Sequence, residues 1–291
     1  MLIGSAPRLY AYTGGKTFDA RLPAIVFIHG AQLDHSVWIL QSRYLAHHGY
    51  AVLALDLPGH GRSEGEALAS VEALADAIAP RLAAATGQPL LLVGHSMGSL
   101  ISLELARRLG PRVAGVALLG TAFPMKVSDA LLTATREAPD AAIEMIDVWS
   151  HAPSIAAFNR PLSSPGPGFS IPGQGRALMR HIARRNGAGV LATDFAACNA
   201  YAGGLEAAAA LSCPALFLLG AGDQMTPPRA ARALRERIRA RRSAARPARW
   251  PTGRSTARWP RGCPAPHRSS GPRPASCRWP RPATPPARAR G

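Results

Sequence analysis

The chain has 291 residues, of which 47% are hydrophobic. This is enough to bury one core plus an insertion without help from disulfides or a structural metal. No stretch approaches the roughly 18 uninterrupted apolar residues of a membrane span, and the N-terminus lacks the apolar core of a signal peptide. We therefore expect a soluble, cytoplasmic protein without metal or cofactor. The chain has four cysteines with neither Cys-x-x-Cys nor Cys/His ligand spacing, which fits the reducing environment of the cytoplasm. They are Cys198, Cys213, Cys263 and Cys277.

The formal charge of +17 is concentrated at the C-terminal end of the chain. Residues 240–291 hold 13 of the 34 Lys and Arg residues and none of the 17 Asp and Glu residues, which leaves +4 for residues 1–239. The first part is therefore an ordinary, mildly basic globular sequence with a small molecule as its expected partner. Binding of a nucleic acid is not expected of it and would depend on the basic tail alone.

Short apolar runs alternate with longer amphipathic runs between residues 23 and 238, which is typical of a parallel α/β sheet. Residues 8–13 predict an edge strand. The apolar runs predict buried strands at residues 24–28, 51–55, 90–93, 113–119 and 215–219. The amphipathic runs predict helices at residues 36–48, 70–86, 97–109 and 228–239. Candidate functional residues follow the strands directly, at the edge where open α/β sheets bind their ligands.

The strand rhythm stops between residues 121 and 211. Helix-like pieces at residues 130–135, 141–150 and 176–185 surround a loop rich in Pro, Gly and Ser at residues 161–175. Such a long insertion after a strand predicts a lid over the site. The predicted organisation is a core of residues 1–121 and 206–239, a helical lid of residues 122–205, and a disordered Arg/Pro-rich tail of residues 240–291.

The pentapeptide Gly94-His95-Ser96-Met97-Gly98 matches the pattern G-x-S-x-G. An apolar run precedes it and an amphipathic run follows it, which is the strand–turn–helix setting that this motif requires. A nucleophile on such a sharp turn needs a strained backbone, and glycines leave room for the neighbouring chain. The turn also aims the backbone N–H of Met97 at a developing oxyanion. Ser96 is therefore the candidate nucleophile, the alternative being a chance match.

Together with three further motifs, this elbow resembles the α/β-hydrolase superfamily over residues 8–239. His29-Gly30-Ala31 resembles the H-G-x turn, whose third residue lends a backbone N–H to the oxyanion hole. Residues 56–63 resemble the D-x-x-G-x-G-x-S loop, and residues 220–227 resemble the G-x-x-D-x-x-x-P segment that supplies the triad acid, here Asp223. The resemblance implies a mostly parallel sheet with flanking helices and a helical lid, and an esterase-like serine hydrolase.

In the implied mechanism, Ser96 attacks an acyl carbon while a histidine takes its proton, and Asp223 orients that histidine. Water then releases the acyl-enzyme. The alternative interpretation of Asp223 is a surface cap for the following helix. A serine nucleophile argues against epoxide hydrolases and haloalkane dehalogenases, which resemble this fold but use an aspartate at that position.

The histidine of the triad is not found in its expected place. Chain order in this fold is Ser, then Asp or Glu, then His, and the family carries the histidine in a Gly-His pair after an eighth strand. Residues 246–255, where that pair should fall, contain none. The histidine that does follow Asp223 is His267, which becomes the candidate base although no strand pattern precedes it. Impaired catalysis is therefore expected.

A disrupted reading frame would explain both the missing Gly-His pair and the unusual composition of residues 240–291. Residues 240–291 hold 13 Arg and 11 Pro but no Leu, Ile, Val, Met or Phe, so they can supply neither a core strand nor an amphipathic helix. We hypothesise a frame disruption near residues 239–242, which translation of the other two frames of the gene would test. The alternative is a genuine disordered arm that binds anions.

Three functions thus remain open from the sequence. The first is a serine hydrolase acting on carboxylic esters or related acyl compounds. The second is a catalytically inactive hydrolase-fold protein that binds a ligand, and the third is polyanion binding through residues 240–291. Neither the substrate nor the oligomeric state can be inferred from these motifs.

Overall fold

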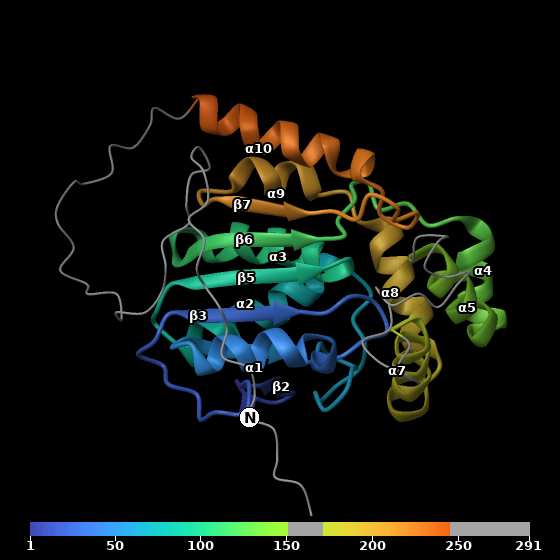
Figure 1. Cartoon of the computed structure of the whole chain (residues 1–291), viewed down its shortest axis with the longest axis horizontal. Coiled ribbons are helices and arrows are strands. Elements are labelled where there is room, and N and C mark those ends of the chain that lie inside the picture. The colour runs from blue at the N-terminus through green and yellow to red at the C-terminus, as the bar shows by residue number, and fades with distance from the viewer. Residues whose placement is uncertain (151–170, 245–291) are drawn as a thin grey trace, which may run out of the picture. The chain divides into compact units, whose positions relative to one another are not determined.

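The computed structural model describes residues 1–150 and 171–244 (Figure 1). These residues lie in one compact unit. The candidate base His267 and nearly all of the predicted tail lie outside the described residues. None of the described helices is long and apolar enough to cross a membrane.

A seven-stranded sheet forms the centre of this unit, with the strand order β1-β2-β4-β3-β5-β6-β7. The pairs β1–β2 and β2–β4 are antiparallel and the remaining pairs are parallel. The sheet is therefore mostly parallel, as predicted. Its strands are β1 (Leu2–Ile3), β2 (Leu9–Tyr12), β3 (Ala24–Ile28), β4 (Ala51–Leu55), β5 (Leu90–His95), β6 (Val113–Leu119) and β7 (Ala215–Leu218).

The central strands are continuous apolar runs because helices cover both of their faces. Every residue of β3 and β4 is buried. The edge prediction for residues 8–13 was wrong in one respect: β2 lies between β1 and β4, and the two-residue strand β1 forms the edge. So short a strand leaves no periodic signal in the sequence.

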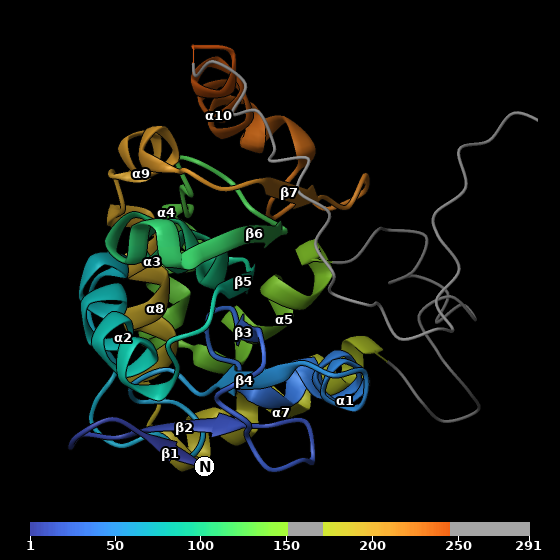
Figure 2. The same cartoon turned by 90° about the vertical axis from the view of Figure 1, so that its left-hand side faces the viewer.

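Helices pack on the two faces of the sheet in unequal numbers (Figure 2). The larger apolar cluster lies between the sheet and α2, α3, α9 and α10, and includes Leu74, Leu100, Ala207 and Leu234. The smaller cluster lies on the opposite face, under Trp38 and α1. The helices of the core are α1 (Ile39–His47), α2 (Val71–Ala85), α3 (Met97–Leu109), α9 (Gly204–Ala210) and α10 (Arg232–Ala244), with short 3-10 turns η1 (His35–Trp38), η2 (Gly110–Arg112) and η3 (Pro228–Ala231).

Between β6 and β7 the chain forms a helical insertion at the carboxyl ends of the parallel strands (Figure 1). Three of its helices fall where helix-like pieces were predicted, but residues 171–175 form the first turns of α7 rather than the predicted loop. The rest of that loop lies outside the described residues. The helix α8 was not predicted. The described helices of the insertion are α4 (Asp129–Glu137), α5 (Pro139–Ser150), α7 (Ile171–Asn186) and α8 (Gly189–Ala200).

In the described part of the chain, β7 is the last strand of the sheet and its outer edge has no neighbour. Leu216 and Leu218 pair with Ala117 and Leu119 of β6, so they share the face on which Leu119 packs against the cluster under α1. Their side chains are 55% and 51% exposed. Among the described helices none covers this part of the face.

Candidate active site

Ser96 lies on a sharp turn between β5 and α3. Its backbone has φ 52° and ψ −120°, which non-glycine residues rarely adopt. The Ser96 N–H donates to Leu119 O at 2.9 Å, which ties the turn to the neighbouring strand. A Cβ on Gly94 would lie 2.1 Å from Gly98 O, and a Cβ on Gly98 would lie 2.3 Å from Ile28 O. Both glycines are therefore required by close backbone packing, as predicted.

The turn that follows β3 lies directly against this elbow. A Cβ on Gly30 would come within 3.2 Å of Ser96 Cβ. The buried His29 ring anchors the turn because its Nδ1–H donates to Gly30 O at 2.8 Å while its Nε2 accepts the Leu57 N–H at 3.1 Å. Since Nε2 must keep its lone pair, His29 is neutral. Burial, followed by the neighbouring His60, lowers the pKa of His29 from 6.5 to about 3.

Anchoring Gly30 O also orients the N–H of Ala31. In a trans peptide the C=O and N–H point in opposite directions, so the bond from His29 turns the Ala31 N–H away from the His29 ring. Ala31 is half-buried and lines the same cavity as Ser96. Met97 is the first residue of α3, where helix geometry leaves backbone N–H groups without an intrahelical partner. The structure thus places Ala31 in one cavity with Ser96, and Met97 directly after Ser96 at the start of α3.

Asp223 follows β7 and lines this cavity together with Ser96. Its Oδ1 accepts the N–H groups of Met225 and Thr226, each at 2.9 Å, and its Oδ2 accepts the Thr226 hydroxyl at 2.7 Å. Asp223 therefore fixes its own loop, but the N-cap residue of the following η3 is Pro227. The alternative interpretation as a helix cap is wrong, whereas the triad role stays a prediction.

Two cavities of about 300 and 250 Å³ adjoin Ser96 and share part of their walls. Both lie between the carboxyl end of the sheet and the helical insertion. The first is lined by apolar side chains of Leu33, Val37, Ile146 and Met179, the second by Met125, Val127, Leu131 and Trp149, and the two share Ala31, Ser96, Phe195, Met225 and Thr226. The space around the nucleophile is thus mainly apolar.

A charged group lies at the far wall of the first cavity. The guanidinium of Arg176 forms an ion pair with Asp147 and a longer one, 3.6 Å, with Glu144. The two carboxylates outweigh its single positive charge, so this wall is not a strong anion-binding site.

Among the described residues, the histidine that lines these cavities is His95. Its ring lies between the turn at Gly30 and Gly120 after β6. Burial lowers the pKa of His95, and the carboxylate of Asp223 partly opposes that shift. No hydrogen bond joins Ser96 Oγ or Asp223 to a histidine within residues 1–150 and 171–244. The described structure thus brings the predicted nucleophile, acid and oxyanion turn to one cavity, with no described histidine hydrogen-bonded between Ser96 and Asp223.

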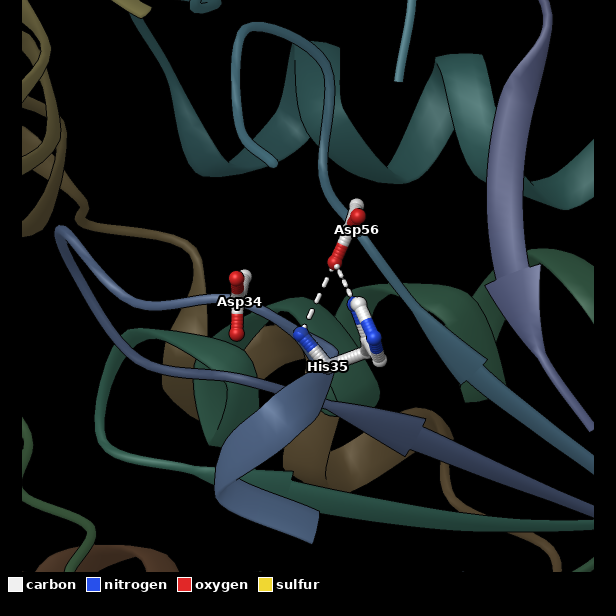
Figure 3. A group of neighbouring side chains, drawn as sticks. All are labelled: Asp34, His35 and Asp56. Atoms are coloured by element: carbon white, nitrogen blue, oxygen red, sulfur yellow. Dashed lines mark hydrogen bonds and ion pairs between the residues drawn. The ribbon is translucent and has the colours of Figure 1, made fainter. Parts of the chain in front are cut away.

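Asp56, the first residue of the predicted D-x-x-G-x-G-x-S loop, bonds His35 (Figure 3). Asp56 Oδ1 accepts the backbone N–H and the ring Nδ1–H of His35 at 2.8 and 2.7 Å, and Asp56 Oδ2 accepts the Arg62 N–H at 2.8 Å. The polar atoms of Asp34, His35 and Asp56 lie within 4.8 Å of one another, a spacing that could hold a metal ion. Asp34 Oδ1, however, caps η1 by accepting the Ser36 N–H. These bonds already account for the cluster, since they hold the two loops together.

Sequence reasoning missed one buried contact beneath the oxyanion turn. Asp194 of α8 accepts hydrogen bonds from the Gln32 N–H and from His60 Nε2, each at 2.8 Å. The signal that could have found Asp194 is its position as a single carboxylate among apolar neighbours, Val190, Leu191 and Phe195.

Comparisons with known proteins agree with this geometry. A family model described as the alpha/beta hydrolase fold matches residues 23–140. The pimeloyl-(acyl-carrier protein) methyl ester esterase of Chromobacterium violaceum is 30% identical over 235 residues, which cover 74% of this chain and 82% of that protein. The crystal structure of a hydrolase from Pseudomonas aeruginosa PA01 superposes with a TM-score of 0.64 at 18% identity, covering 80% of this chain and 84% of that one.

The chain belongs to the α/β-hydrolase fold family. Other matches are shorter. The dihydrolipoyllysine-residue acetyltransferase component of the acetoin cleaving system of Cupriavidus necator is 35% identical over 123 residues, 42% of this chain and 30% of that protein. The chain spans about a third of the length of the first three curated relatives, between 30% and 37%. These partial matches therefore support the fold and do not assign the activities of those relatives to this chain.

Proposed function

We propose that this protein is a serine hydrolase that acts on carboxylic esters or related acyl compounds, with Ser96 as the nucleophile. The observation that carries the proposal is the strained elbow, which places Ser96 in one cavity with Asp223 and Ala31. Strain of this kind persists where the surrounding structure enforces it, and it clusters at functional sites.

In the proposed reaction, Ser96 Oγ attacks the acyl carbon and the resulting oxyanion accepts the N–H groups of Ala31 and Met97. Collapse of the tetrahedral intermediate expels the alcohol and leaves an acyl group on Ser96. Water then attacks this ester and releases the acid. Asp223 would orient the base and stabilise its charged form. His267 is our candidate for that base, because it follows Asp223 in the chain.

The apolar walls of the two cavities favour an ester whose acyl and alcohol parts are both largely apolar. Their combined space suits a small or medium-sized substrate. The helical insertion covers these cavities, and we propose that it acts as the lid. The name of the Chromobacterium violaceum relative, a methyl ester esterase, agrees with a carboxylic ester as substrate class.

Hydrolysis of p-nitrophenyl butyrate by the purified full chain tests the proposal. If His267 completes the triad, Ser96→Ala should lower kcat/KM by about a thousandfold or more, because the covalent step is lost; without a base the loss should be smaller, since triad members act as a unit. Ser5→Ala, a matched control on the exposed N-terminal segment, should leave it unchanged. Turnover clearly above the uncatalysed rate and equal in the wild type and Ser96→Ala would reject Ser96 as the nucleophile.

His267→Ala tests the base separately. A loss as large as that of Ser96→Ala is expected if His267 reaches the triad, since triad members act as a unit. Unchanged turnover would reject His267 and leave the serine assignment intact.

A further inference from the structure

Three segments far apart in sequence meet at one buried point beneath the oxyanion turn. Gln32 follows the turn itself, His60 belongs to the loop after β4, and Asp194 lies on α8 of the insertion. The side chains of His60 and Asp194 are 0% and 1% exposed. An ionisable pair buried this completely needs strong mutual bonding to persist.

The hydrogen bonds of His60 define its protonation state. Its Nε2 faces Asp194 Oδ2 at 2.8 Å, and its Nδ1 faces Pro58 O at 3.0 Å. Both partners are acceptors, so both ring nitrogens carry hydrogen and the ring is an imidazolium. Burial lowers the pKa of His60, but the Asp194 carboxylate outweighs it and the net direction is upward. The pair is therefore a buried histidinium–carboxylate ion pair.

The same carboxylate oxygen holds the backbone of the turn. Asp194 Oδ2 accepts the Gln32 N–H at 2.8 Å, and Gln32 has φ 55°, in the left-handed region that few non-glycine residues adopt. The Gln32 side chain donates to Met179 O of α7 at 3.2 Å. The insertion thus binds both the main chain and the side chain of the residue next to Ala31.

We propose that Asp194, with His60 as its counter-ion, is a positioning residue for the oxyanion hole. Two peptide groups flank the Cα of Ala31: His29 holds the first through Gly30 O, and Asp194 holds the second through the Gln32 N–H. Because both peptide groups are held in place, the direction of the Ala31 N–H is fixed. This inference rests on the proposed function, because it assigns a role to a donor of that reaction.

A consequence follows for the insertion. Because Asp194 lies on α8, the oxyanion turn is complete only when that helix is docked on the core. His60 keeps the carboxylate in place, and its charge offsets the burial of Asp194.

The experiment compares Asp194→Ala, Asp194→Asn and the control Asp140→Asn in the full chain. Asp140 lies on the same insertion, but its side chain is 80% exposed and pairs with Arg180. Two quantities are measured: kcat and KM for p-nitrophenyl butyrate, and amide hydrogen exchange of residues 29–33 relative to the strands of the core.

Asp194→Ala should lower kcat about tenfold or more with little change in KM, because an oxyanion donor acts in the transition state. Exchange at residues 29–33 should accelerate about tenfold while the core strands stay protected. Asp194→Asn keeps an acceptor oxygen for the Gln32 N–H but loses the charge that pairs with His60, so it should show an intermediate loss of kcat and intermediate exchange. Asp140→Asn should match the wild type.

If kcat and exchange at residues 29–33 stay at wild-type values while only the melting temperature falls, the pair is structural and the proposal is wrong. If Asp194→Ala does not fold, Asp194→Asn alone must show an intermediate loss of kcat, and wild-type behaviour would overturn the proposal. A wild-type chain that does not hydrolyse the ester would bear on the proposed function alone, while exchange at residues 29–33 still tests whether Asp194 holds the oxyanion turn.

Discussion

Histidine protonation differs sharply between two rings that lie 5.0 Å apart beneath the active site. His29 is neutral because its Nε2 accepts a backbone N–H, and His60 is charged because both of its nitrogens donate. The charge on His60 is one reason that the pKa of His29 is low. Both rings stabilise the backbone of the oxyanion turn: His29 bonds Gly30 O, and His60 pairs with Asp194, which accepts the Gln32 N–H.

The pKa of His29 predicts how stability depends on pH. This pKa is about 3 in the folded chain, whereas the ordinary value of 6.5 applies to the unfolded chain. As the pH is lowered below 6.5, the unfolded chain therefore binds a proton that the folded chain does not. The free energy of unfolding should therefore decrease as the pH is lowered from about 6.5 to about 3. This site contributes up to about 1.4 kcal/mol of that decrease per pH unit. His29→Gln removes this dependence. Urea unfolding at several pH values should show the wild type losing stability relative to the variant, and parallel curves would contradict the assignment.

Ser96, Ala31, Met97 and Asp223 could be predicted because each belongs to a short motif whose chemistry is local. A strained turn needs glycines beside it, and these can be seen in the sequence. The Asp194 contact could not be predicted, since it joins residues 162 positions apart. Its pairing depends on how α8 docks, which no local pattern encodes.

At the level of elements, the parallel strands were the most predictable part of the fold. Their continuous apolar runs follow from burial on both faces, and β3, β4 and β6 have the predicted bounds. The helix α8 was missed because its residues are apolar on most sides, so its sequence shows no 3.6-residue period. This composition is expected for a helix that lies between the core and other helices. The strand β1 was too short to detect.

The edge strand β7 is expected to promote self-association of the chain. Leu216 and Leu218 are half-exposed on an unpaired edge among the described residues, a combination that favours association between copies. The double substitution Leu216→Thr and Leu218→Thr keeps strand propensity and should reduce self-association in sedimentation experiments. Stability should change by less than about 1.5 kcal/mol, well below the value for two fully buried leucines. A much larger loss would show that another segment covers this face.

At the scale of the whole molecule, the described residues include the proposed nucleophile, acid and oxyanion turn of an α/β-hydrolase, and none of the described histidines is bonded to Ser96 or Asp223. The sheet, the elbow at Ser96 and the predicted oxyanion turn and acid come from residues before 224, whereas the family's histidine should follow them. The sequence of residues 240–291 lacks the aliphatic residues that a further strand and helix would need. The frame-disruption hypothesis therefore remains the physical explanation that we favour for the missing base.

The most direct test of this account is the reaction of the folded chain with a fluorophosphonate probe, followed by mass spectrometry of the digested protein. The account predicts a single adduct on Ser96 that disappears in Ser96→Ala, because the elbow and the oxyanion turn still present the hydroxyl to an acyl-like phosphorus centre. Absence of an adduct from a folded sample, or an adduct on another serine, would contradict it and favour a hydrolase-fold protein that only binds its ligand.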